Sequence, residues 1–332
     1  YQYIERAILV DREYHLDRQY VVRDGEIVIV DEFTGRLAEG RKWRDGIHQA
    51  VEAKQGVEVT VATGQAARIT VQDFFLRYEH LAGMTGTAMG SARELRRIYR
   101  CHVLPIPTNR PAIRQRLPDR VFGDADARWR AVVDEVAELH AAGRPVLIGT
   151  RSIDKSELLS EMLETLGIEH QVLNANHIEA EADIVARAGG AGKVTVSTNM
   201  AGRGTDIKLG EGVHDLGGLH VICTEMHDSS RIDRQLIGRC GRQGDPGTFR
   251  QYLSLDDDLL LAGLGPDKSR KLKDLGEQSL ENFDRLGRLF RKAQRKVEHR
   301  HYRQRKTLMY FEKERKKMQR QMGQDPYLDT PG

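Results

Sequence analysis

The clearest structural signal in this chain is Val194-Thr-Val-Ser-Thr-Asn-Met-Ala-Gly-Arg-Gly-Thr-Asp-Ile-Lys-Leu-Gly210. It opens with β-branched residues in an apolar alternation, which predicts a strand. It then breaks at Gly202-Arg203-Gly204, where two glycines let the backbone approach a ligand closely and adopt positive φ. Arg203 offers a planar pair of donors to phosphate oxygens, and Asp206 can bind a hydroxyl, a metal-bound water or an arginine. Because open α/β sheets bind ligands at the carboxyl ends of parallel strands, the pattern predicts a phosphate site.

A second segment, Arg231 to Asp245, carries the other half of this predicted site. It is expected to start as a helix, and the spacings of Gln235, Arg239 and Arg242 place all three on one helix face. Two arginines aimed at one point are costly unless an anion lies between them. The alternative is a surface helix of salt bridges with a glycine-rich end. We rank it lower because the loop and the helix occur together in the expected order.

Both segments resemble motifs V and VI of superfamily 2 helicase-type motors. Their wording, Thr198-Asn-Met-Ala-Gly-Arg-Gly-Thr-Asp206 and Gln235-Leu-Ile-Gly-Arg-Cys-Gly-Arg-Gln-Gly-Asp245, is similar to that of the SecA family of bacterial preprotein translocase ATPases. The resemblance extends from about residue 18 to about residue 310. The chain departs from the family in a short connection between Asp206 and Gly217, and in Met226 and Ile237, where basic residues are usual.

The rest of the second half alternates strands and helices. Strands are expected at 145–150, 171–174, 194–197, 219–223 and 249–253, and helices at 127–142, 152–166 and 178–188. This βαβ order predicts an α/β fold with a doubly wound parallel sheet, and the resemblance identifies it as the RecA-like second lobe of a superfamily 2 motor. A small N-terminal α+β piece, with a hairpin about Asp24-Gly25, and one long basic helix over 286–322 complete the expected fold.

The resemblance also implies a division into four parts. These are the tail of a preprotein cross-linking domain, the end of a first nucleotide-binding lobe with its linker, the whole second lobe, and a helical scaffold segment with a tail, at residues 1–62, 63–108, 109–264 and 265–332.

A small-residue loop follows a helix expected over 66–82. Its members, Gly83, Thr85, Gly86 and Thr87, resemble motif III, which couples nucleotide state to lobe movement. Alone, a plain turn would explain the loop; its place before motifs V and VI favours the coupling role. Thr150-Arg-Ser-Ile-Asp-Lys-Ser156 resembles motif IV, although a capped helix start explains most of it.

One glycine-rich segment imitates a phosphate loop. Gly189-Gly-Ala-Gly-Lys193 lacks the Walker A spacing, is followed by Val194 instead of Ser or Thr, and leads into a strand. We find no other Walker A candidate and no Mg-holding acid pair after a buried strand. The family relation implies that ATP or ADP with Mg binds jointly with a first lobe outside this chain, with Arg239 and Arg242 as arginine fingers and Gly202, Arg203, Gly204, Asp206 and Gln235 contacting nucleotide. This chain alone is then expected to be inactive, with no metal site of its own.

Composition limits the remaining choices. The chain has 332 residues, a formal net charge of +3 and no run of eighteen apolar residues, so no transmembrane helix is expected. Its start at Tyr1 suggests a fragment of a longer chain. The three cysteines lack metal-ligand spacing and fit a reducing cytosol.

The family relation implies a cytoplasmic protein peripherally associated with the inner membrane. Its partners would be unfolded preprotein and a protein-conducting channel, with anionic lipid and a homodimer as further candidates. Two alternatives stay open: a SecA-like binding module without hydrolysis, and an RNA helicase lobe, which would bind RNA in a strongly salt-dependent way. The resemblance of residues 18–56 to a preprotein cross-linking domain argues against the RNA helicase alternative and against nucleic acid as a partner.

Overall fold

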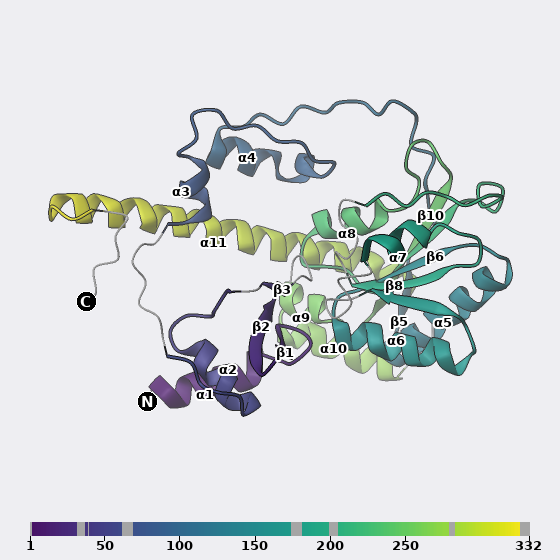
Figure 1. Ribbon diagram of the computed structural model, residues 1–332, viewed down its shortest axis with the longest axis horizontal. Helices are drawn as coiled ribbons and strands as arrows, with labels where there is room; N and C mark the ends of the chain where they lie inside the picture. The colour runs from purple at the N-terminus through teal and green to yellow at the C-terminus, as the bar shows by residue number, and fades with distance from the viewer. Residues whose placement is uncertain are drawn as a thin grey trace.

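A computed structural model describes residues 2–31, 37–38, 40–61, 69–173, 181–198, 205–278 and 283–325 (Figure 1). Its centre is a seven-stranded sheet in the order β4-β10-β9-β6-β8-β7, with β5 also pairing with β10. Every pairing in this sheet is parallel. The predicted doubly wound parallel sheet is therefore confirmed.

The strands lie close to their predicted positions. They are β4 Gln115–Arg116, β5 Arg120–Phe122, β6 Val146–Thr150, β7 His170–Leu173, β8 Val194–Thr198, β9 Leu219–Cys223 and β10 Gly247–Ser254. All residues of β6, β8 and β9 are buried. The short strands β4 and β5 were not predicted, because two or three residues carry no readable alternation.

Helices cover both faces of the sheet. On one face, α5 (Ala125–Ala141) and α6 (Ile153–Thr165) pack Val132 and Leu159 against Val146 and Ile148 of β6. On the other face, α7 (Glu181–Arg187) and α8 (Ser230–Ile237) pack against the intervening Leu147. Alternate residues of β6 thus face opposite layers, as the period of a strand requires. Residues 188–192 form turns between α7 and β8, so the Gly189–Lys193 segment is a connection, as expected.

A third cluster joins the sheet edge to the C-terminal helices α9 (Asp258–Leu264), α10 (Pro266–Gln278) and α11 (Gly287–Gln321). The first turns of α11 bury Phe290, Ala293 and Val297 in this cluster. At Gly263 of α9, a Cβ atom would stand 2.5 Å from the Cα of Ala293. The backbones of α9 and α11 therefore approach so closely at this point that only glycine fits. The predicted long helix is confirmed, and it extends away from the sheet (Figure 1).

The N-terminal piece contains α1 (Gln2–Glu13), α2 (Ile47–Gln55) and the strands β1 (Tyr20–Arg23), β2 (Glu26–Val30) and β3 (Leu37–Ala38). The predicted hairpin is present, with Asp24 and Gly25 both at positive φ (52° and 79°), as a type I′ turn requires. Val21 and Val30 of this hairpin form a small apolar cluster with Ile153 at the start of α6.

Residues 69–100 form two short helices beside the outer half of α11 (Figure 1). The helix expected over 66–82 is wrong in extent: α3 spans only Val71–Phe75, and 62–68 lie outside the described residues. After a 3₁₀ turn at Ala88–Ser91, α4 runs over Ala92–Tyr99. Arg305 of α11 makes a bidentate ion pair with Glu94 at 2.6 and 2.9 Å, and Lys316 pairs with Asp73. The outer half of α11 is thus held by ion pairs, whereas its first turns are held by the buried apolar residues Phe290, Ala293 and Val297. None of the described helices is both long and apolar enough to cross a bilayer.

Candidate functional site

The arginine-bearing segment is a helix followed by a tight turn. The helix α8 ends at Ile237, with Gly238 as its cap, so Arg239 and Arg242 do not share a helix face with Gln235. The predicted spacing argument is therefore wrong: the helix stops before Arg239, and Gly241 turns the chain at φ 61°. Gln235 lies in the last turn of α8 and is half-buried.

The two arginines nevertheless converge on the segment that follows β8. Nη1 of Arg239 donates to the backbone oxygen of Thr205 at 3.1 Å. Nη1 of Arg242 lies 2.8 Å from Oδ1 of Asp206, and its Nε donates to the carbonyl of Gly238 at 2.8 Å. The two segments that sequence analysis joined are thus in contact. Gly202, Arg203 and Gly204 lie outside the described residues.

The arginine pair lies over a face of the sheet, away from its carboxyl edge. The chain after Asp206 has already returned to the start of β8, because the amide of Gly210 donates to the carbonyl of Gly189 at 2.9 Å. Arg239 also lines a small hollow with Leu147 of β6 and Thr195 of β8. The residues that directly follow β8, 199–204, lie outside the described residues, so the expectation of a ligand site at the carboxyl end of this strand stays a prediction.

Two further arginines support the turn and were missed by sequence reasoning. Arg114 donates to the carbonyl of Cys240 at 2.9 Å, and Arg110 to that of Gln243 at 3.4 Å. A Cβ at Gly241 would approach the Cβ of Arg114 to 2.6 Å, which explains glycine there. No pattern announced these contacts, since Arg110 and Arg114 belong to an extended linker that pairs with the turn only in the fold.

The charged groups at this turn are partly open to solvent. Arg242 and Asp206 are partly exposed, with 33% and 45% of their side-chain surfaces accessible. Arg242 contacts the carboxylate of Asp206 and the carbonyl of Gly238, and Arg239 contacts the carbonyl of Thr205. Guanidinium groups bind phosphate oxygens through paired hydrogen bonds. The arrangement can therefore hold a phosphoryl group that takes the place of Asp206 on Arg242.

The predicted coupling loop lies beside α8 and not at the arginine turn. Thr87 is buried and its Oγ1 lies 3.2 Å from that of Thr85, whereas Gly83 and Gly86 are exposed. In the following 3₁₀ turn, a Cβ at Gly90 would stand 3.6 Å from Nη1 of Arg234. The 3₁₀ turn that follows the loop, Ala88–Ser91, thus lies beside the helix that leads to Arg239.

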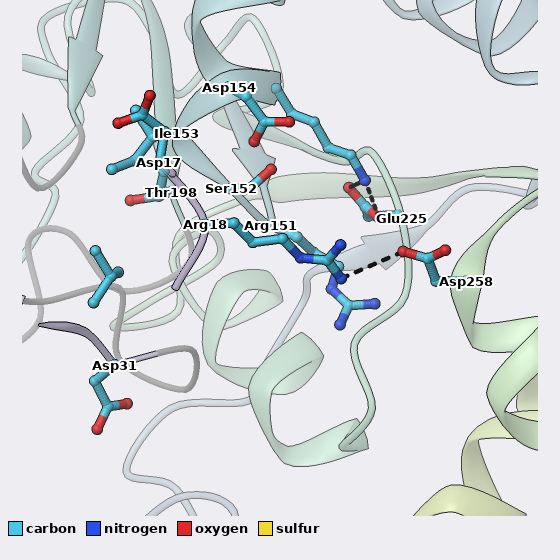
Figure 2. A pocket seen from close by; sticks show the side chains of 12 residues that line it. Asp17, Arg18, Asp31, Arg151, Ser152, Ile153, Asp154, Thr198, Glu225 and Asp258 are labelled. Atoms are coloured by element: carbon cyan, nitrogen blue, oxygen red, sulfur yellow. Dashed lines mark hydrogen bonds and ion pairs between the residues drawn. The ribbon is translucent and has the colours of Figure 1, made fainter. Parts of the chain in front are cut away.

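A cavity of about 130 Å³ occupies the carboxyl edge of the sheet (Figure 2). It lies where β6, β8 and β9 end, and the N-terminal hairpin segment closes its other side. Its basic residues are outnumbered by acidic ones: Arg18, Arg151 and Lys155 against Asp17, Asp31, Asp154, Glu225 and Asp258.

Each of the three cations in this cavity has a carboxylate partner. Lys155 Nζ contacts both oxygens of Glu225 at 2.8 and 2.9 Å. Arg151 pairs with Asp228 at 3.4 Å and Arg18 with Asp258 at 3.4 Å. Burial alone would raise the pKa of Glu225, but Lys155, Arg128 and Arg151 hold it below its usual value. The motif IV resemblance at 150–156 gave a hint of this cavity, but the acidic partners come from distant segments.

Metal and thiol chemistry find no support at either place. In the described part of the chain, no cluster of His, Cys, Asp and Glu side chains is arranged to hold a metal ion. Cys101, Cys223 and Cys240 are free thiols, and burial raises the pKa of Cys240 to about 11.

Comparison with known proteins reveals close relatives. The family model "SecA P-loop domain" matches residues 111–213 and 211–276, and "SecA preprotein cross-linking domain" matches 1–52. "Protein translocase subunit SecA 2" of Rhodopirellula baltica is 68% identical over 338 residues, covering 100% of this chain and 51% of that protein. "Protein translocase subunit SecA" of Caldicellulosiruptor saccharolyticus is 53% identical over 300 residues, covering 89% of this chain and 35% of that protein.

Among solved structures, the E. coli DEAD-box protein SrmB bound to the regulator RraA aligns with 48% of this chain and 87% of that chain, at 22% identity and a TM-score of 0.37. The chain spans about half the length of the R. baltica relative and about a third of the length of the C. saccharolyticus relative. The P-loop domain match alone extends over residues 111–276, half of the chain. With the cross-linking domain match at the N-terminus, it shows that this chain belongs to the SecA family.

Proposed function

We propose that this chain supplies the second motor lobe of a SecA-type protein translocase, and with it the arginine half of an ATP site. The observation that carries the proposal is the contact of Arg239 and Arg242 with Thr205 and Asp206. Arg239 and Arg242 act as arginine fingers, and Gly202, Arg203, Gly204, Asp206 and Gln235 contact nucleotide. Mg-ATP or ADP binds between this lobe and a first lobe that carries the phosphate loop.

The chemistry of the site is electrostatic. Asp206 neutralises Arg242, with Nη1 of the arginine 2.8 Å from Oδ1 of the carboxylate. When the lobes close on ATP, phosphate oxygens displace this carboxylate, and both guanidinium groups stabilise charge that develops on the γ-phosphate. Comparable arginine fingers raise hydrolysis rates by roughly 10³–10⁵. The glycine-threonine loop at Gly83–Thr87 reports lobe closure to α8 through the 3₁₀ turn that follows it, where Gly90 lies near Arg234.

The wider assignment follows the relatives' names. Residues 1–62 form the tail of a preprotein-binding domain, 63–108 the end of the first lobe, 109–264 the second lobe and 265–332 a scaffold segment. The protein moves unfolded preprotein through a membrane channel while it is peripherally attached on the cytoplasmic side, with anionic lipid and a second copy as further partners. The match of residues 1–52 to a preprotein cross-linking domain supports this reading.

Calorimetry with Mg-ATP and ADP tests the proposal, followed by phosphate release in the same samples. This chain alone is expected to show neither binding nor turnover. A chimera of the R. baltica protein, in which this chain replaces the matched segment, is expected to hydrolyse ATP. Turnover by this chain alone, lost in Arg242→Ala, would mean that it contains a complete phosphate site and would overturn the proposal.

A binding module without hydrolysis is the second candidate, and the acidic cavity favours it. Five carboxylates surround three cations between the hairpin segment and α6, an environment that suits a basic peptide segment. A chimera that binds peptide but releases no phosphate, beside an active R. baltica parent, would select this candidate.

A further inference from the structure

The long helix α11 holds the first turn of α8 through two side chains. Nε2 of Gln294 donates to the carbonyl of His227 at 2.7 Å and to Oδ2 of Asp233 at 2.6 Å. Oε1 of Glu298 accepts from both the amide and the hydroxyl of Ser230, at 2.7 and 2.8 Å. Gln294 and Glu298 are four residues apart, so they lie one above the other on one face of α11.

The segment that they hold is itself cross-linked and buried. Oδ1 of Asp233 accepts from the amide and from Nδ1 of His227, at 3.0 and 2.6 Å. Gln294, His227 and Asp233 are 4%, 4% and 6% exposed. Hydrogen bonds are stronger in such a low-dielectric setting, and a partner left unpaired there is costly. The first turn of α8 therefore cannot rotate on α11 without breaking this network.

The arginine turn lies directly beyond the same helix. α8 has only eight residues and ends at Ile237, so Arg239 follows after Gly238. At the rise of an α-helix, Ile237 at the end of α8 stands about 10 Å from Ser230. A rigid rod of this length transmits any change in the direction of its first turn to Arg239 and Arg242.

We propose that Gln294 and Glu298 are positioning residues that set the direction of α8, and through it the aim of Arg239 and Arg242 at the phosphate. The role of the two arginines rests on the proposed function. The coupling between α11 and α8 rests on the hydrogen bonds of Gln294 and Glu298 described above. The outer half of the same helix contacts Glu94 and Asp73. Movement of the 69–100 segment against the second lobe therefore reaches the arginine turn through α11.

The test is the ATPase activity of the R. baltica chimera with Glu298→Ala or Gln294→Ala. We expect kcat to fall by roughly tenfold or more with the KM for ATP little changed, since misaimed groups weaken the reaction more than binding. Glu298→Gln should retain most activity, because its amide oxygen still accepts from Ser230. In a background that carries both Arg239→Ala and Arg242→Ala, Glu298→Ala should cause no further loss. Glu312→Gln is the matched control, because Glu312 pairs with Arg315 on α11 itself, far from α8.

Hydrogen exchange on this chain alone supplies a readout independent of hydrolysis. Glu298→Ala should speed amide exchange across 228–242 while the β-sheet amides keep their protection. An unchanged kcat, a loss that multiplies with the combined Arg239→Ala and Arg242→Ala change, or unchanged exchange at 238–242 would overturn the inference. If neither the chimera nor its parent hydrolyses ATP, the proposed function fails, and the exchange result alone decides whether α11 positions the turn.

Discussion

The molecule keeps two groups of cations close to its central sheet, and their partners differ. In the cavity at the carboxyl edge, Lys155 grips both oxygens of Glu225, whose side chain is only 5% exposed. At the turn after α8, Arg242 meets Asp206, whose side chain is 45% exposed, and Arg239 meets a backbone oxygen. The residues that line the cavity include more acidic than basic ones.

This difference teaches which cations can take an anion. A buried carboxylate that is fully paired does not give way, since its release would leave a charge out of water without a partner. A half-exposed carboxylate exchanges its partner for solvent at little cost. Phosphate should therefore bind at the arginine turn, and Lys155 of the cavity should serve the fold.

The largest expected effect concerns hydrolysis. In the R. baltica chimera, Arg242→Ala should lower kcat by roughly 10³, because it removes a guanidinium from the developing phosphate charge. Lys155→Met should leave kcat within about threefold of the parent, since its cation already belongs to Glu225. Phosphate-release kinetics measure both.

If Lys155→Met matched the loss in Arg242→Ala while the protein stayed folded, the two groups of cations would share one role and the contrast would break down.

An intermediate effect is expected on stability. Lys155→Met leaves Glu225 buried without its closest partner and should lower the free energy of unfolding by about 2 kcal/mol. Asp206→Ala removes a partly exposed partner and should change it by less than about 1 kcal/mol. Urea titrations of this chain, followed by circular dichroism, give both values.

Equal losses in the two variants would mean that Asp206 is as firmly tied into the fold as Glu225, and phosphate could not displace it easily.

The smallest effect is a dependence on pH. Lys155 and its neighbours lower the pKa of Glu225 in the fold, so the unfolded chain binds this proton more readily. Glu225 therefore stabilises the fold when the pH is above the ordinary pKa of a glutamate side chain, 4.5. This stabilisation is lost as the pH falls below that pKa. The slope should be about 1 kcal/mol per pH unit. Urea titrations between pH 3 and 5 measure it.

Glu225→Gln removes the titrating group and should flatten this slope; an unchanged slope would assign the acid sensitivity to other carboxylates.

The sheet could be predicted from the sequence because its strands are short, buried and β-branched. The expected strand at 219–223 coincides with β9, and that at 194–197 is one residue shorter than β8. The expected helix at 66–82 failed because its apolar residues pack locally: the rings of Phe74 and Phe75 meet edge to face with centroids 5.4 Å apart, and both remain partly exposed. A stripe of aromatic residues does not reveal whether a core lies opposite.

The sequence was enough to predict which two segments form the arginine site, but not how their residues are arranged in space. Sequence order paired the 198–206 and 235–245 segments, and their contact follows from the sheet. The path of the chain at Gly238 and the return of Gly210 to Gly189 depend on tertiary packing, which local spacing does not encode. The hydrogen bonds of Gln294 and Glu298 to the start of α8 join residues more than sixty positions apart, so no local sequence pattern could indicate them.

The crossing of Gly263 with Ala293 has a mechanical consequence. Such close backbone contact leaves no compressible side chain, so α11 has a fixed fulcrum near its buried end. From Val297 to Gln321, the helix forms an arm of about 36 Å. A rotation of only about 5° at the fulcrum would sweep the tip through about 3 Å, a distance set by that arm length. A minor adjustment beside the sheet is thereby enlarged into a displacement that could do work on a neighbour.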